Sequence, residues 1–174
     1  MTNDSIVQLL ENAIIPDANK RFKKWKLLEL GSGRGLLIEE LRDLGVDAYG
    51  IDIAPRRRYK YLKKGDIRYL NQVFGRQKFQ IIVANGVLCL GGLVQGLSNT
   101  QGASLSDDNI GQLAKQTALE ILQSSYNQLI KPGVFINTED NYQDSLIYSR
   151  KNVKDIGFVP YFMNKRVSIL EKQK

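Results

Sequence analysis

Acidic side chains stand at the ends of successive apolar segments of this sequence. Glu29, Asp52 and Asp66 each fall at or just after the end of a short apolar run, and a further polar group, Glu139–Asn141, follows a later run. Carboxylates accept hydrogen bonds from hydroxyl and amino groups and attract cations. Together, these ends would suit a ligand that carries hydroxyls, amino groups or positive charge, rather than pyrophosphate alone.

A glycine-rich segment, Gly31-Ser32-Gly33-Arg34-Gly35, follows the first of these acids. Glycines let the backbone approach a ligand closely. Asp52 lies 21 residues after Gly31, where an acid at a strand tip accepts hydrogen bonds from ribose hydroxyls. The spacing is G-x-G-x-G instead of the dinucleotide pattern G-x-G-x-x-G, and no P-loop run is present. Glu29, two residues before the first glycine, suits a cation such as an amino-acid ammonium.

The composition excludes several kinds of chemistry. The chain has no histidine and one cysteine, so it has no Ser-His-Asp triad, no Cys-His pair, no disulfide framework and no Cys-rich zinc site. We expect no metal at the site. Cys89 lies in an apolar run, which favours a buried structural thiol.

Apolar strands alternate with amphipathic helices along the chain. Strands are predicted at 25–30, 46–53, 59–62, 79–84 and 134–137, helices at 36–44, 110–130 and 142–156, and a terminal hairpin at 158–163 and 167–171. This order predicts an α/β fold: a doubly wound, mostly parallel, Rossmann-like sheet with helices on both faces and a C-terminal antiparallel hairpin strand. Ligands bind such sheets beyond the carboxyl ends of the strands.

The chain reads as one domain over residues 1–174, because it has no repeat and no linker-like stretch. Residues 1–20 are expected to form an N-terminal helix or arm. Residues 91–109 are rich in Gly, Ser, Asn and Gln and are expected to form a lid loop. No apolar stretch is long enough to span a bilayer and no signal peptide is evident, so we expect a cytoplasmic protein without a membrane partner.

The net charge of +7 is concentrated in two short segments. Eleven basic residues fall within 20–26 and 56–64, and the rest of the chain has 14 basic against 18 acidic residues. Such runs attract phosphate-bearing partners or serve only as solvated faces, and the sequence leaves both readings open.

The segments LLELGSGRG, YGIDIAP, GDI, FQIIVANGVLCL and LIKPGVFI, in this order, resemble the class I S-adenosylmethionine-dependent methyltransferase family. The resemblance implies S-adenosyl-L-methionine as cofactor. It implies that Glu29 and the glycine loop meet its methionine part, that Asp52 holds the ribose and Asp66 the adenine amino group, and that Asn85 with Gly86 and Val87 borders the methyl group. The implied cofactor-binding set is Glu29, Gly31, Ser32, Gly33, Gly35, Asp52, Ile53, Asp66, Ile67, Asn85, Gly86 and Val87.

The chain departs from the family pattern in two places. Only 13 residues separate Asp52 from Asp66, so the second crossover helix is expected to be short or missing, replaced by the basic run 56–64. ANGVLCL is not an N-P-P-Y motif and is more similar to the A-x-G-V-L segment of small-molecule methyltransferases.

The expected activity is in-line methyl transfer to a small-molecule or natural-product acceptor. One alternative is a ribose 2′-O RNA methyltransferase that binds nucleic acid through Arg56–Lys64, although Asn85 stands where that family has an aspartate. Another is a cofactor-binding subunit without activity. Candidate bases are Tyr59, Tyr61, Glu139, Asp140 and Tyr142, each also explicable as a packing or capping residue, so the catalytic residue stays unassigned.

Overall fold

The computed structural model describes residues 25–88, 107–138, 148–163 and 167–173, together with Gln8 and Leu93. Several sequence predictions lie outside these residues. They are the N-terminal arm, nearly all of the lid loop, Cys89, the candidate bases at 139, 140 and 142, and the turn of the terminal hairpin.

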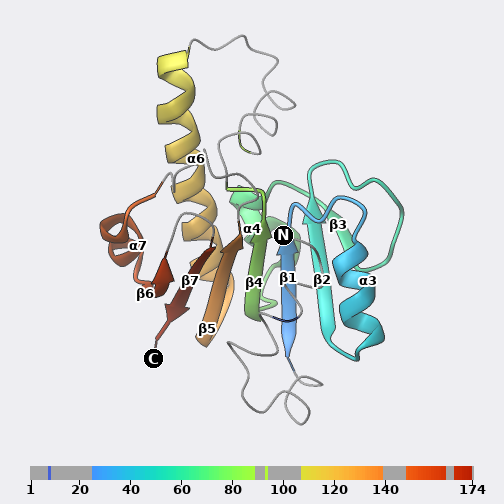
Figure 1. The fold of residues 1–174 in the computed structure, drawn as a ribbon. Coiled ribbons are helices and arrows are strands. Elements are labelled where there is room, and N and C mark those ends of the chain that lie inside the picture. The colour runs from blue at the N-terminus through green and yellow to red at the C-terminus, as the bar shows by residue number, and fades with distance from the viewer. Residues whose placement is uncertain are drawn as a thin grey trace.

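A seven-stranded sheet forms the centre of the molecule (Figure 1). Its strands are β1 (Lys26–Leu30), β2 (Asp47–Asp52), β3 (Leu62–Lys64), β4 (Phe79–Asn85), β5 (Leu129–Thr138), β6 (Val159–Met163) and β7 (Val167–Lys172). The order is β3-β2-β1-β4-β5-β7-β6; the first five strands run parallel, and β7 runs antiparallel to both β5 and β6. The predicted fold class is confirmed.

Helices cover both faces of the sheet because the strand side chains alternate between two apolar clusters. Leu27 of β1 packs with the buried face of α3 (Leu36–Asp43), whereas Leu28 and Leu30 pack in the cluster that contains α6 (Asp107–Gln128). The short helices η3 (Ile67–Tyr69) and α4 (Leu70–Phe74), and α7 (Arg150–Ile156), lie on the α6 face.

The connection between β2 and β3 contains no helix: residues 53–61 form only turns and bends. The expectation of a short or missing second crossover helix is therefore confirmed, since the helix is missing. The predicted third strand is misplaced, since β3 begins at Leu62 rather than ending there. The rings of Tyr59 and Tyr61 pack edge to face, with 5.3 Å between their centroids. These two aromatic residues therefore pack against each other in the turn before β3 and are not part of a strand.

Three boundaries on the C-terminal side also differ from prediction. The helix α6 ends at Gln128, not at 130, and the Gln128 amide donates to the carbonyls of Gly75 and Gln77. The strand β5 starts at once with Leu129, not at 134. The last helix starts at Arg150, not at 142, because Ser149 caps it by accepting from the Asn152 N–H at 3.2 Å. None of the described helices combines the length and apolarity needed to cross a bilayer.

Candidate active site

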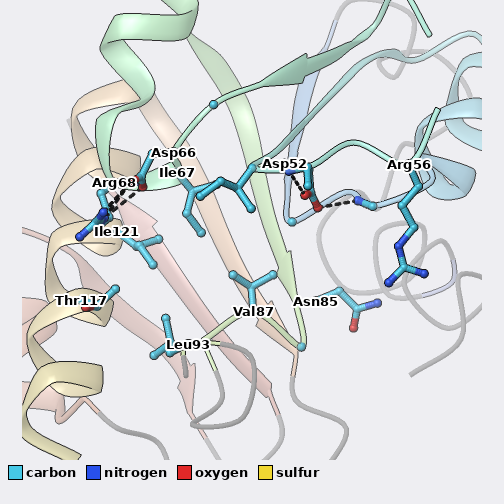
Figure 2. A pocket seen from close by; sticks show the side chains of 16 residues that line it. Asp52, Arg56, Asp66, Ile67, Arg68, Asn85, Val87, Leu93, Thr117 and Ile121 are labelled. Carbon is cyan, nitrogen blue, oxygen red and sulfur yellow. Dashed lines mark hydrogen bonds and ion pairs between the residues drawn. The ribbon is translucent and has the colours of Figure 1, made fainter. Parts of the chain in front are cut away.

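A cavity of about 360 Å³ opens beyond the carboxyl ends of β1, β2 and β4 (Figure 2). These strands are neighbours and run parallel, so the turns that follow them converge at one edge of the sheet. Nine residues of the predicted cofactor-binding set line the cavity: Gly31, Gly33, Asp52, Ile53, Asp66, Ile67, Asn85, Gly86 and Val87. The other three, Glu29, Ser32 and Gly35, do not line it.

The glycine loop is shaped by three left-handed residues, Gly31, Gly33 and Gly35, with φ of 67°, 52° and 70°. Only glycine adopts this backbone region without strain. The loop is fastened to the sheet, since the Ser32 N–H donates to the Ile51 carbonyl at 3.1 Å. Its last glycine is the N-cap of α3. Ser32 and Gly35 therefore hold the loop rather than face the cavity.

Asp52 holds this loop from the adjacent strand. Its Oδ2 accepts from the Gly33 N–H and its Oδ1 from the Ala54 N–H, both at 2.8 Å. Each carboxylate oxygen accepts a second hydrogen bond readily, because it has two lone pairs. The carboxylate is thus oriented by the backbone and keeps acceptor capacity toward the cavity.

Asp66 is held differently, in an ion pair with Arg68. The guanidinium donates to both carboxylate oxygens at 2.6–3.1 Å, and the Arg68 N–H donates to Oδ1 at 2.9 Å. Burial alone would raise the pKa of Asp66, but the hydrogen bonds and charge of Arg68 outweigh it and lower that pKa. Asp66 and Arg68 therefore form one end of the cavity wall, where their opposite charges neutralise each other (Figure 2).

Glu29 is buried beneath the glycine loop, at 7% exposure, and its Oε2 has no hydrogen-bond partner. Burial, followed by the nearby charge of Asp52, raises the pKa of Glu29 to about 8. An unpartnered buried carboxyl is costly, and a cation placed close to it would lower that cost.

Asn85 stands at the end of β4, where Thr138 of β5 fixes its side chain. The Thr138 hydroxyl donates to Asn85 Oδ1 at 2.8 Å, and the Gly86 N–H donates to the Thr138 carbonyl at 2.7 Å. The amide oxygen of Asn85 is thereby turned toward Thr138, and its NH₂ group is a hydrogen-bond donor at the cavity.

Comparison with known proteins agrees with this geometry. Residues 5–90, about half of the chain, match the family model described as a methyltransferase domain. The chain belongs to the class I S-adenosylmethionine-dependent methyltransferases. A sequence search of curated proteins finds no match.

Solved structures of methyltransferases share the fold at low sequence identity. Magnesium protoporphyrin IX methyltransferase from Synechocystis PCC 6803, solved with bound SAM, is 15% identical, with 97% of this chain and 76% of that chain covered and a TM-score of 0.57. The sugar N-methyltransferase KedS8 from Streptoalloteichus is 9% identical, with 99% and 87% covered and a TM-score of 0.61. TrmN from Thermus thermophilus is 17% identical, with 98% and 48% covered and a TM-score of 0.58.

Sequence reasoning missed part of this methyltransferase's cavity wall. Thr117 and Ile121 of α6 line it, one helical turn apart, and Leu93 joins them as a buried contact. Arg68 was missed as well. A local signal for it exists, because Asp66 caps the short helix η3 and its side chain accepts a hydrogen bond from the Arg68 N–H, two residues later. Tyr59 and Tyr61 do not line the cavity. In the described part of the chain, no three His, Cys, Asp or Glu residues gather as metal ligands do.

The glycine loop also touches the turn after β4, which gives a test of its packing. A Cβ on Gly31 would clash with Val87 Cγ2, whereas a Cβ on Gly33 would meet nothing within 4 Å. Both have positive φ, so Gly33→Ala should cost about 1 kcal/mol in unfolding free energy and Gly31→Ala about 1–3 kcal/mol more. Denaturant unfolding measures both values.

The control is the double variant Gly31→Ala/Val87→Ala, which removes the clashing methyl group. In the Val87→Ala background, Gly31→Ala should lower the unfolding free energy by about as much as Gly33→Ala does in wild type. Equal losses for the two glycine variants would contradict the contact.

Proposed function

We propose that this methyltransferase transfers a methyl group from S-adenosyl-L-methionine to a small-molecule acceptor held at the Asn85–Val87 edge of the cavity. The observation that carries the proposal is the meeting of the glycine loop, Asp52 and the Asn85 turn around one cavity of about 360 Å³. Bound cofactor supplies a methyl group on a positively charged sulfur, which needs no further activation.

The residues present fit this cofactor. The buried carboxyl of Glu29, whose Oε2 has no hydrogen-bond partner among the described residues, fits a cationic amino-acid portion. The open space over Gly33 lets a ligand approach the backbone, and the oriented carboxylate of Asp52 fits ribose hydroxyls. Ile53 and Ile67 provide apolar contact beside Asp66, as an adenine ring requires.

The chain contributes to transfer mainly by positioning and by excluding water. Val87, Leu93 and Ile121 contribute apolar side chains to the cavity wall, and Val87 belongs to the Asn85 turn. Leu93, which belongs to the expected lid loop 91–109, lies in the cavity wall. Among the described residues that line the cavity there is no lysine, and Asn85 is not an acid, which speaks against a ribose 2′-O mechanism.

The first experiment measures cofactor binding. Isothermal calorimetry of the purified chain should show binding of S-adenosylhomocysteine, the demethylated product, and none of NAD. Tight binding of NAD, with no binding of S-adenosyl-L-methionine or S-adenosylhomocysteine, would overturn the proposal.

The second experiment tests transfer. Incubation with methyl-deuterated cofactor and a pool of amine, carboxylate, phenol and thiol acceptors, followed by mass spectrometry, should reveal a deuteromethylated small molecule. A parallel incubation contains total RNA, and labelled RNA there with no labelled small molecule in the pool would overturn the choice of acceptor class.

A further inference from the structure

A second, more open hollow of about 730 Å³ lies on the turn segment between β2 and β3. Five cationic side chains line it: Arg56, Arg57, Arg58, Lys60 and Lys64. None of the described residues that line it is acidic. Arg56 also lines the active-site cavity, so the two hollows adjoin at this residue.

One of these cations has a structural partner. The Arg57 guanidinium donates to Glu39 Oε2 at 3.0 Å and to the Gly35 carbonyl at 3.3 Å. It therefore fastens the basic segment to the start of α3.

Three others, Arg56, Arg58 and Lys64, are exposed and form no ion pair with any residue that the structure describes. Like charges held close together repel, and a bound anion removes that repulsion.

The position of Arg56 is fixed by the backbone. Its N–H donates to the Gly33 carbonyl at 3.0 Å, and the next residue is the anchored Arg57. Figure 2 shows the Arg56 and Asn85 side chains at the same end of the cavity, away from the Asp66–Arg68 pair. Because the Asn85 amide oxygen is turned toward the Thr138 hydroxyl, its NH₂ group and the Arg56 guanidinium are both hydrogen-bond donors there.

The two ends of the cavity thus differ in charge. Arg68, the other cation in its wall, is neutralised by Asp66, whereas Arg56 forms no ion pair with a carboxylate in the described part of the chain. A guanidinium and an amide donor, next to further cations, are the groups that bind phosphate and carboxylate oxygens.

We propose that the basic hollow is an anion-binding subsite and that the methyl acceptor is a small molecule bearing a phosphate or carboxylate group. This inference rests on the proposed function and names its substrate class. All lining side chains come from the single segment 55–64, which suits one anionic group better than a track of nucleic-acid phosphates.

The experiment is calorimetry of the full chain with inorganic pyrophosphate, at low salt, with S-adenosylhomocysteine present. Acetate in place of pyrophosphate separates a carboxylate site from a phosphate site. Pyrophosphate should bind, and Arg56→Ala/Arg58→Ala should weaken it by about tenfold or more. Arg76→Ala, at an exposed arginine outside both hollows, is the matched control and should leave the affinity within about twofold of wild type.

The outcomes separate this inference from the proposed function. Wild-type protein that binds S-adenosylhomocysteine but neither pyrophosphate nor acetate overturns the anion subsite alone. Equal weakening by the control variant also overturns it, because the attraction would then be nonspecific. Single-stranded RNA that binds a hundredfold tighter than pyrophosphate, with steep salt dependence, assigns the hollow to nucleic acid and overturns the small-molecule acceptor.

Discussion

Asp52→Ala is expected to weaken S-adenosylhomocysteine binding by about 10- to 150-fold, or roughly 1.5–3 kcal/mol. The substitution removes a charged acceptor that would bind ribose hydroxyls. It also releases the N–H groups of Gly33 and Ala54, so the glycine loop loses one of its hydrogen bonds to β2 and keeps the one from the Ser32 N–H to the Ile51 carbonyl. Calorimetry gives the affinity, and the unfolding free energy should fall at the same time.

A second aspartate on the same strand provides the matched control. Asp47 lies at the opposite end of β2 and pairs with Arg42 at 3.1 Å, away from the cavity. Asp47→Ala should change cofactor affinity by less than about twofold, whatever it does to stability. If Asp52→Ala bound the product as tightly as wild type, the assignment of the ribose contact would be wrong.

The sequence allowed prediction of the elements whose signal is local. The apolar run of β4 and the glycine-to-helix transition before α3 each depend on neighbouring residues, and both are found as expected. Asp52 and Asn85 could be placed at one edge because parallel strands share their carboxyl ends.

Features that depend on tertiary packing were not predictable in this way. α4 has five residues, too few for a helical period to emerge, and it is held by η3 and α6 rather than by its own pattern. Thr117 and Ile121 reach the cavity only because α6 packs across the sheet. The pairing of Arg57 with Glu39 joins residues 18 positions apart, and no spacing in the sequence signals it.

Glu29→Gln is expected to remove a large pH dependence of stability. The carboxyl has a pKa of about 8 in the folded protein against 4.5 when unfolded. Between these values the folded state keeps a proton that the unfolded state has lost, so stability falls as pH rises from 4.5 to about 8. At about 1.4 kcal/mol for each pH unit, the full effect approaches about 5 kcal/mol.

Denaturant unfolding at a series of pH values measures this effect as the difference between wild type and Glu29→Gln. Glutamine resembles the protonated carboxyl, so the variant should gain on wild type steadily as pH rises toward 8. Glu40→Gln, on α3 outside the cavity wall, controls for the loss of one charge. Parallel stability curves for wild type and Glu29→Gln would mean that Glu29 is already ionised in the folded state.

The same carboxyl should link cofactor binding to pH. An ammonium group near Glu29 favours its ionised form, so binding below pH 8 requires loss of a proton. The affinity of wild type for S-adenosylhomocysteine should therefore increase by up to about tenfold for each pH unit from 6 to 8. In Glu29→Gln this slope should be lost, and the affinity at pH 8 should fall below that of wild type. Calorimetry in buffers of different ionisation enthalpy would detect the released proton directly, and a slope that survives in the variant would exclude Glu29 as its source.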